Sequence, residues 1–202
     1  MNLMRFAPGV WRYALPPFAL AVPATVISPL AAGVAILLGL SVLAFFRDPD
    51  RHPPADGILA PADGRVTVCR REGDRVRVGV FMNVTNVHVI RAPQSDAVVE
   101  VTHEPGANRP AFSKDSERNE RLRIDCEEVT VILIAGAFAR RITPYIDSGE
   151  RLVRGERIGH IAFGSRVDVI LPPEVTREDL AVERGDRVRA GETVIVPESA
   201  RP

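Results

Sequence analysis

Lysine and cysteine are scarce in this chain of 202 residues. Lys114 is the only lysine, so any covalent chemistry that needs a lysine amine depends on that residue. Cys69 and Cys126 are the only cysteines, and neither lies in a C-x-x-C spacing. We therefore expect two buried thiols rather than a disulfide framework or a cysteine metal site.

The chain also lacks an excess of charge of either sign, with 26 basic and 26 acidic residues. A general nucleic-acid-binding protein is usually strongly basic, so we expect no nucleic-acid partner. Histidines occur only at positions 52, 88, 103 and 160, without the close spacing that a metal site or a metallopeptidase needs. We therefore expect no metal.

The front of the chain has no charged residue between positions 13 and 46. A single helix of that length would measure about 51 Å at about 1.5 Å per residue, whereas the hydrocarbon core of a bilayer is about 30 Å thick. Prolines also interrupt the run, at positions 16, 17, 23 and 29. The sequence predicts two apolar helical segments, about 13–28 and 30–46, with a turn near Pro29.

Arginines flank this apolar pair on both sides, at positions 5, 12, 47 and 51. Positive charge at both flanks is typical of a hairpin whose two ends face the cytoplasm. Residues 1–50 are therefore expected to form a hairpin at the cell membrane, with the remaining domain on the cytoplasmic side. Each segment is near the lower limit for spanning, so a spanning and an interfacial hairpin both remain open.

A secretory signal peptide is the competing interpretation of this front segment. Its cleavage site would have to lie within residues 21–24, where Pro23 is unfavourable. The second apolar segment would then have no explanation.

The pattern changes after a polar linker at residues 50–55. Short runs rich in valine and isoleucine follow, separated by glycine, aspartate and proline, and this pattern predicts a compact, mainly β domain over residues 51–202. The clearest runs are 64–68, 75–81, 98–102, 130–134 and 167–171.

An internal repeat refines this prediction. Residues 147–156 and 183–192 share the pattern Gly-acid-Arg-apolar-x-x-Gly-Glu. Glycines at these positions suit tight turns, and the pattern resembles the hairpin unit of barrel-sandwich domains such as biotinyl and lipoyl carriers. We expect one barrel-sandwich-like β domain preceded by the apolar helical hairpin. Residues 105–121 are polar and charged and are expected to form a solvated loop.

Three short stretches within the β region contain candidate catalytic residues. They are Pro61-Ala62-Asp63-Gly64, Asn86-Val87-His88 and Phe163-Gly164-Ser165-Arg166. Each has an ordinary structural explanation when it stands alone. An Asp-Gly pair usually makes a turn, a histidine in an apolar strand is usually a hydrogen-bonded core residue, and a serine at the start of a strand usually bonds local backbone.

Together with other blocks, these stretches resemble the short form of the phosphatidylserine decarboxylases over nearly the whole chain. The matching blocks appear in the family's order and with its spacing. They are the apolar front with Phe45-Phe46-Arg47-Asp48-Pro49, the Pro-Ala-Asp-Gly turn, the Asn-Val-His strand, the loop that ends in Asn119-Glu120-Arg121, and the Phe-Gly-Ser-Arg stretch.

The resemblance implies that the chain cuts itself between Gly164 and Ser165. The Ser165 hydroxyl attacks the Gly164 carbonyl to give an ester, and elimination then leads to a pyruvoyl group. A large chain, 1–164, and a small chain, 165–202, stay associated. The pyruvoyl group takes the amine of an anionic serine phospholipid as a Schiff base and acts as the electron sink while carbon dioxide leaves.

The resemblance also assigns roles to the site residues. Ser165 is the nucleophile, His88 the base and later the acid, and Asp63 the carboxylate that orients His88. Larger family members have a second histidine three residues after the first, where this chain has Arg91. Either His88 serves both steps, or Arg91 binds the phosphate or carboxylate of the substrate.

Other points stay open at this stage. A membrane-anchored carrier module is the alternative function, although such carriers need a lysine at a hairpin tip and Lys114 lies in the charged loop. Diacyl and archaeal ether lipids carry the same head group, so the lipid backbone is undetermined. The sequence also leaves open whether the chain forms a homo-oligomer.

Overall fold

The computed structural model describes residues 5–106, 119–136, 142–162 and 165–200. The chain divides into two compact units, residues 1–50 and 51–202. The expectation of a mainly β fold preceded by two helices is confirmed. Gly164, Lys114 and most of the predicted loop 105–121 lie outside the described residues.

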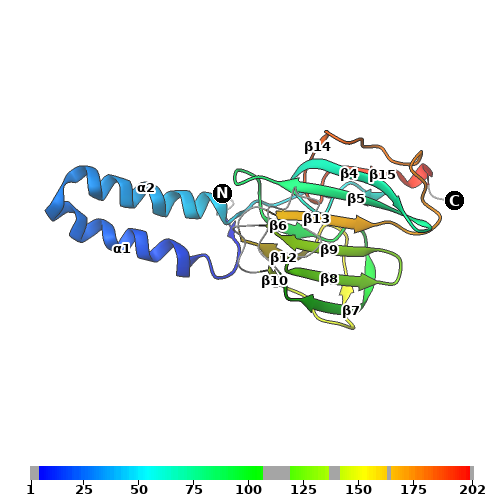
Figure 1. Ribbon diagram of the computed structural model, residues 1–202, viewed down its shortest axis with the longest axis horizontal. Coiled ribbons are helices and arrows are strands. Elements are labelled where there is room, and N and C mark those ends of the chain that lie inside the picture. The colour runs from blue at the N-terminus through cyan, green and yellow to red at the C-terminus, as the bar shows by residue number, and fades with distance from the viewer. Residues whose placement is uncertain (1–4, 107–118, 137–141, 163–164, 201–202) are drawn as a thin grey trace. The chain divides into compact units, whose positions relative to one another are not determined.

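The first unit consists of two helices and one short strand pair. Helix α1 spans Trp11–Ile27, α2 spans Pro29–Phe45, and the two run side by side (Figure 1). Strand β1 (Arg5–Phe6) pairs with β2 (Arg47–Asp48), so the segments before α1 and after α2 are hydrogen-bonded to each other. The ring of Phe18 packs so closely on Gly39 that an added Cβ would lie 2.6 Å from it.

Ser28 separates the two helices, as its side chain accepts a hydrogen bond from the Ala31 amide at 3.1 Å and Pro29 occupies the first turn of α2. Proline is tolerated there because that amide would have no helical partner. The prediction that every proline breaks the run is wrong, because α1 continues through Pro16, Pro17 and Pro23. Each of these prolines lacks the amide hydrogen for one helical hydrogen bond, but the packing of α1 along α2 is kept. Within the described residues, no helix combines the length and the apolarity that crossing a bilayer requires.

The second unit contains an eight-stranded antiparallel sheet, a three-stranded sheet and a strand pair. The large sheet has the order β11-β7-β8-β9-β13-β5-β4-β14, the small sheet β10-β12-β6, and the pair is β15-β3. The strands are β3 (Ile58–Leu59), β4 (Gly64–Glu72), β5 (Arg75–Met82), β6 (Val89–Arg91), β7 (Asp96–Glu104), β8 (Arg121–Cys126), β9 (Thr130–Ala135), β10 (Ile142–Pro144), β11 (Arg151–Leu152), β12 (Arg157–Ile161), β13 (Ser165–Ile170), β14 (Arg187–Val188) and β15 (Val194–Val196).

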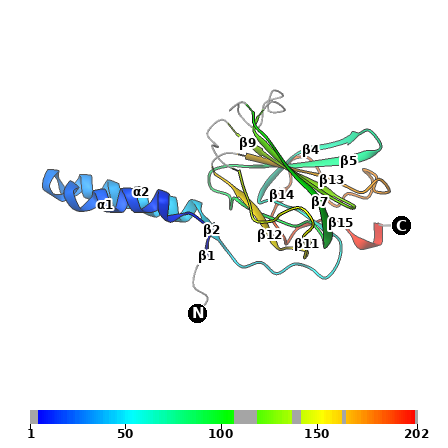
Figure 2. The same ribbon diagram turned by 90° about the horizontal axis from the view of Figure 1, so that it is seen from below.

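Alternation along the strands produces one continuous core. Residues 76, 78, 80 and 82 of β5 and residues 167 and 169 of β13 all belong to it. The strands curl round this interior, as both views show (Figures 1 and 2). Cys69 and Cys126 are free and only partly buried, so the expectation of two unpaired thiols holds and that of full burial does not.

The internal repeat corresponds to a twofold pattern of backbone contacts. The Gly155 amide donates to the Ala92 carbonyl, and the Gly191 amide donates to the Ala60 carbonyl, both at 2.9 Å. The segments that receive these bonds also bond each other, from Leu59 N to Pro93 O and from Arg91 N to Pro61 O, both at 2.8 Å. Strands β11 and β14, which follow the same pattern, close the two edges of the large sheet.

Gly64, the first residue of β4, is expected to be irreplaceable. Its φ is +153°, and an added Cβ would lie 2.1 Å from the Phe81 carbonyl oxygen. Gly64→Ala should therefore lower the free energy of unfolding by more than about 2 kcal/mol, measured by urea titration. Gly73→Ala is the matched control, because Gly73 also has a positive φ, +66°, but open space around it. Its loss should be only about 1 kcal/mol, and equal losses for both variants would contradict the predicted clash.

Candidate active site

Ser165 is the first residue of a strand that lies at the centre of the large sheet. It pairs with Met82 at the end of β5 and with Ala135 at the end of β9. Its relative exposure is 0%, and its hydroxyl has no hydrogen-bond partner among the residues that the structure describes. A buried hydroxyl without a partner is costly, which singles this one out as a candidate for chemistry.

His88 lies at the same end of the sheet as Ser165. The chain leaves β5 after Met82, turns through residues 83–86 and reaches His88, whose carbonyl accepts a hydrogen bond from the Ile161 amide at 3.2 Å. Ile161 is four residues before Ser165 in the sequence. Ser165 thus pairs with the end of β5, and His88 follows the turn after β5 and bonds the end of β12.

The His88 ring is buried at 3% exposure, and its Nδ1 lies 3.0 Å from the Asn86 carbonyl oxygen. A carbonyl can only accept, so Nδ1 is the nitrogen that donates this bond. In the neutral ring this leaves the lone pair on Nε2, which is the form that a general base needs.

The role of Asp63 in orienting His88 stays a prediction, and the contacts of Asp63 are as follows. Its carboxylate receives two hydrogen bonds from Arg51 Nη2, at 2.9 and 3.0 Å, and one from the Ala190 amide at 2.8 Å. Arg51 also bonds Glu192 at 3.1 Å. These donors hold the Asp63 carboxylate, while His88 Nδ1 bonds the Asn86 carbonyl.

Asn86 is therefore a site residue that the sequence analysis missed. It belongs to the Asn-Val-His stretch, and its backbone oxygen rather than its side chain contacts His88. A signal was present, since asparagine favours turns that bring a carbonyl near a following side chain. The pattern cannot show which carbonyl the ring will meet.

Arg91 lies at the end of β6, buried, and its Nη1 donates to the Gly155 carbonyl at 2.9 Å. An added Cβ on Gly191 would lie 2.9 Å from Arg91 Cδ. Arg91 thus packs between the two turns of the repeat. Its role in substrate binding stays a prediction.

Asn119 and His160 are two further buried polar residues near Ser165. Asn119 Nδ2 donates to the carbonyl of Ala135, the β9 partner of Ser165, at 2.7 Å. His160 pairs with Val89, next to His88, and its Nδ1 lies 2.8 Å from the Tyr145 hydroxyl oxygen. Burial lowers the pKa of His160 to about 4, so its ring is neutral near pH 7.

Asp168 lies on the opposite face of β13 from Ser165, completely buried. It forms ion pairs with Arg77 Nε at 2.9 Å and Arg166 Nε at 2.8 Å. Burial raises the pKa of Asp168, and the two arginines oppose that rise. The pair with Arg77 joins β13 to its neighbour β5, and the pair with Arg166 lies within β13.

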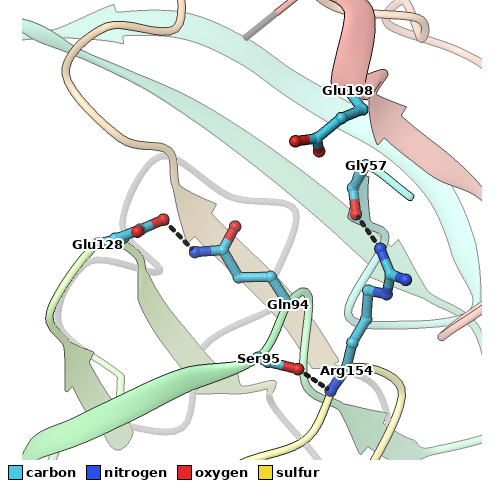
Figure 3. Close-up of a pocket in the computed structure, with 6 residues that line it drawn as sticks. All are labelled: Gly57, Gln94, Ser95, Glu128, Arg154 and Glu198. Carbon is cyan, nitrogen blue, oxygen red and sulfur yellow. Dashed lines mark hydrogen bonds between the residues drawn. The ribbon is translucent and has the colours of Figure 1, made fainter. Parts of the chain in front are cut away.

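A polar hollow of about 200 Å³ contains Ser95, which occupies in one half of the repeat the position that Asp63 occupies in the other. Figure 3 shows Ser95 accepting a bond from the Arg154 amide at 3.1 Å, which repeats the bond from the Ala190 amide to Asp63. Glu128 and Glu198 also line this hollow. Glu128 precedes Thr130, which pairs with the last residue of β13, so the hollow lies at the other end of the sheet from Ser165.

No group of three histidine, cysteine or carboxylate side chains in the described ranges could hold a metal ion.

The neutral state of His160 predicts a pH dependence of stability. Between about pH 4 and pH 6.5 an unfolded histidine binds protons that the folded His160 does not, so stability should fall as the pH drops through this window. Urea titrations at pH 7 and pH 4.5 measure the difference. In His160→Gln that difference should shrink by on the order of 1 kcal/mol. An unchanged difference would show that His160 does not contribute.

The comparisons with known proteins place the chain in a family. A family model described as phosphatidylserine decarboxylase matches residues 38–196. A protein of Halobacterium salinarum, provisionally named an archaetidylserine decarboxylase proenzyme, is 57% identical over 93% of this chain and 96% of its own length. Phosphatidylserine decarboxylase proenzymes of Thermobifida fusca and Streptomyces avermitilis are 53% and 47% identical over 87% and 88% of this chain, and 76% and 78% of their own. The chain therefore belongs to the phosphatidylserine decarboxylase family.

Proposed function

We propose that this protein decarboxylates the serine head group of a membrane phospholipid, using a pyruvoyl group made from its own Ser165. The observation that carries the proposal is the Ser165 hydroxyl, fully buried and without a partner among the described residues, at the first position of a central strand. The proenzyme names of the relatives agree with a chain that is cut before it acts.

The proposed cut lies between Gly164 and Ser165 and gives chains 1–164 and 165–202. His88 Nε2 takes the proton of the Ser165 hydroxyl, and the oxygen attacks the Gly164 carbonyl carbon. The amide bond breaks, an ester forms, and the former amide nitrogen becomes an amine. Pairing of β13 with β5 and β9 holds Ser165 on both sides while this happens, so little freedom is lost on the way to the transition state.

The environment of Ser165 suits a pyruvoyl precursor, because a buried terminal group at this position is shielded from water. When present, the pyruvoyl group supplies a carbonyl that binds the substrate amine and accepts the electrons released with carbon dioxide. His88 then returns a proton to the product through Nε2, while Nδ1 keeps its bond to the Asn86 carbonyl. Arg91 is the candidate for binding the phosphate or carboxylate of the substrate.

The lipid backbone is the finer part of this proposal. Relatives that carry archaetidylserine and phosphatidylserine names both resemble the chain over most of its length. The chemistry acts on the head group alone, and decarboxylation rates with diether and diacyl lipids of the same head group measure the preference.

Membrane contact is proposed for the first unit, at the cytoplasmic face of the cell membrane. Both helices expose large apolar side chains, among them Leu20, Val22, Val26, Ile27 and Leu30. Exposed apolar side chains at this density favour contact with lipid over water. A substrate that stays in the bilayer requires an enzyme that reaches it there.

A denaturing gel tests the self-cleavage. The purified protein should give two bands, and Ser165→Ala should give one, because alanine has no hydroxyl to attack Gly164. The small fragment should have the mass of residues 165–202 with a blocked amino terminus. His88→Gln should slow cleavage by roughly 10²-fold or more, as expected for loss of a general base.

Two controls accompany this gel. Ser199→Ala removes an exposed serine of the small fragment, and His52→Gln removes an exposed histidine. Both should be cut like the unaltered protein. A native protein that runs as one full-length band with an ordinary serine at position 165 would refute the proposal.

Vesicle sedimentation tests the membrane contact. Ile27→Asp places a charge on an exposed apolar position and should lower binding to anionic phospholipid vesicles at least about tenfold. Val153→Asp is the matched control, since Val153 is exposed and apolar but belongs to the second unit. Equal binding of Ile27→Asp and the unaltered protein would exclude this face from the contact.

A further inference from the structure

We propose that a cationic hollow at the ends of β4 and β5 binds the phosphate of the substrate head group. This inference rests on the proposed function and names the part of the protein that recognises the phosphodiester. The hollow measures about 450 Å³, and the residues that carry the argument are Arg65, Arg187, Asn83, Thr85 and Asn86. We call it the head-group hollow.

Two arginines on neighbouring strands line the head-group hollow side by side. Arg65 of β4 and Arg187 of β14 are directly opposite in the strand register. Like charges at opposite positions of an antiparallel pair are destabilising unless an anion lies between them. Arg65 donates to the Gly185 carbonyl, whereas the Arg187 guanidinium has no hydrogen-bond or ion-pair partner among the described residues.

No carboxylate balances these charges, since the described residues that line the hollow include no aspartate or glutamate. Two other polar hollows differ in this respect. The hollow of Figure 3 contains Glu128 and Glu198 beside Arg154, and another contains Asp74 and Glu178 beside its arginines. The head-group hollow is therefore the one of the three suited to an anion.

The turn that forms one wall of the hollow is fixed by its own hydrogen bonds. Asn83 Oδ1 accepts from the amide and the hydroxyl of Thr85, at 2.9 and 2.6 Å, and Asn86 Oδ1 accepts from the Asn83 amide at 2.9 Å. Because both side-chain oxygens are used inside the turn, the amide NH₂ groups of Asn83 and Asn86 remain available as donors to an anion. The same Asn86 orients His88 through its carbonyl.

The hollow lies near the start of β13, on the face of the sheet opposite the Ser165 side chain. Arg65 pairs with Phe81, and Phe81 pairs with Arg166, the residue after Ser165. Two strand spacings separate Arg65 from Arg166, roughly 10 Å at about 4.8 Å each. Amine and phosphorus of a phosphoserine head group lie roughly 5 Å apart, at about 1.5 Å per bond.

Phosphate is favoured over the substrate carboxylate as the bound anion. The carboxylate leaves as neutral carbon dioxide, so a guanidinium bonded to it would stabilise the substrate more than the transition state and slow the reaction. The phosphate keeps its charge throughout. Arginines on a group that does not react can therefore hold the lipid without opposing decarboxylation.

Steady-state kinetics on the cleaved full-length protein test the hollow. For phosphatidylserine in neutral detergent micelles, Arg187→Gln should raise KM on the order of tenfold and change kcat less than about twofold, because it removes one charge-assisted bond to a group that does not react. Arg184→Gln is the matched control, since it removes an exposed positive charge from the same turn but from outside the hollow. Its KM should equal that of the unaltered protein.

A binding measurement that needs no cleavage accompanies the kinetics. Calorimetry with water-soluble glycerophosphoserine on Ser165→Ala should show binding that Arg187→Gln weakens by the same factor and that inorganic phosphate competes away. An unchanged KM and affinity in Arg187→Gln, or an equal loss in Arg184→Gln, would overturn the phosphate site. An unaltered protein that binds glycerophosphoserine at the hollow but releases no carbon dioxide would refute the proposed function and leave the site standing.

Discussion

The fold depends on backbone hydrogen bonds between two equivalent segments of the repeat, residues 59–61 and 91–93. Leu59 bonds Pro93 and Arg91 bonds Pro61, while each segment receives the amide of one repeat glycine. These bonds need no particular side chains, so the two halves keep the same backbone while their side chains diverge. Asp63 stands in one half where Ser95 stands in the other. The two halves therefore share a backbone, and the candidate site lies in one half because of the side chains found there.

Asp63 and His88 each have their own hydrogen-bond partners in the candidate site. Arg51 and Ala190 hold Asp63, and Asn86 holds His88. The carbonyl of Asn86 fixes the tautomer of His88 without adding a negative charge next to the ring. A carbonyl partner stabilises a charged imidazolium less than a carboxylate would, which suits a base that must also give its proton back. Asp63 instead joins the chain just after the first unit to the turn that contains Ala190.

Much of the fold could be predicted from the sequence, because it follows from local patterns. Runs of valine and isoleucine gave the strands, and the spacing of Gly149, Gly155, Gly185 and Gly191 gave the repeated turns. The partner of Asp63 could not be predicted, since Arg51 and Ala190 reach it through tertiary packing. The position of His160 could not be predicted either, since only the pairing of β12 with β6 places it beside His88. The prolines within α1 led to a wrong prediction for a related reason. Packing of α1 against α2 outweighs the tendency of proline to break a helix.

The position of β13 has a consequence for the order of folding and cleavage. The strand has a neighbour on each side along its entire length, so the residue at its start reaches its final surroundings only when β5 and β9 are already in place. If the chain is cut before Ser165, the break arises inside a finished sheet, and the new terminus is retained by the neighbours rather than released. Cutting would then act as a quality check, because a misassembled chain would lack the geometry to mature and would stay inert.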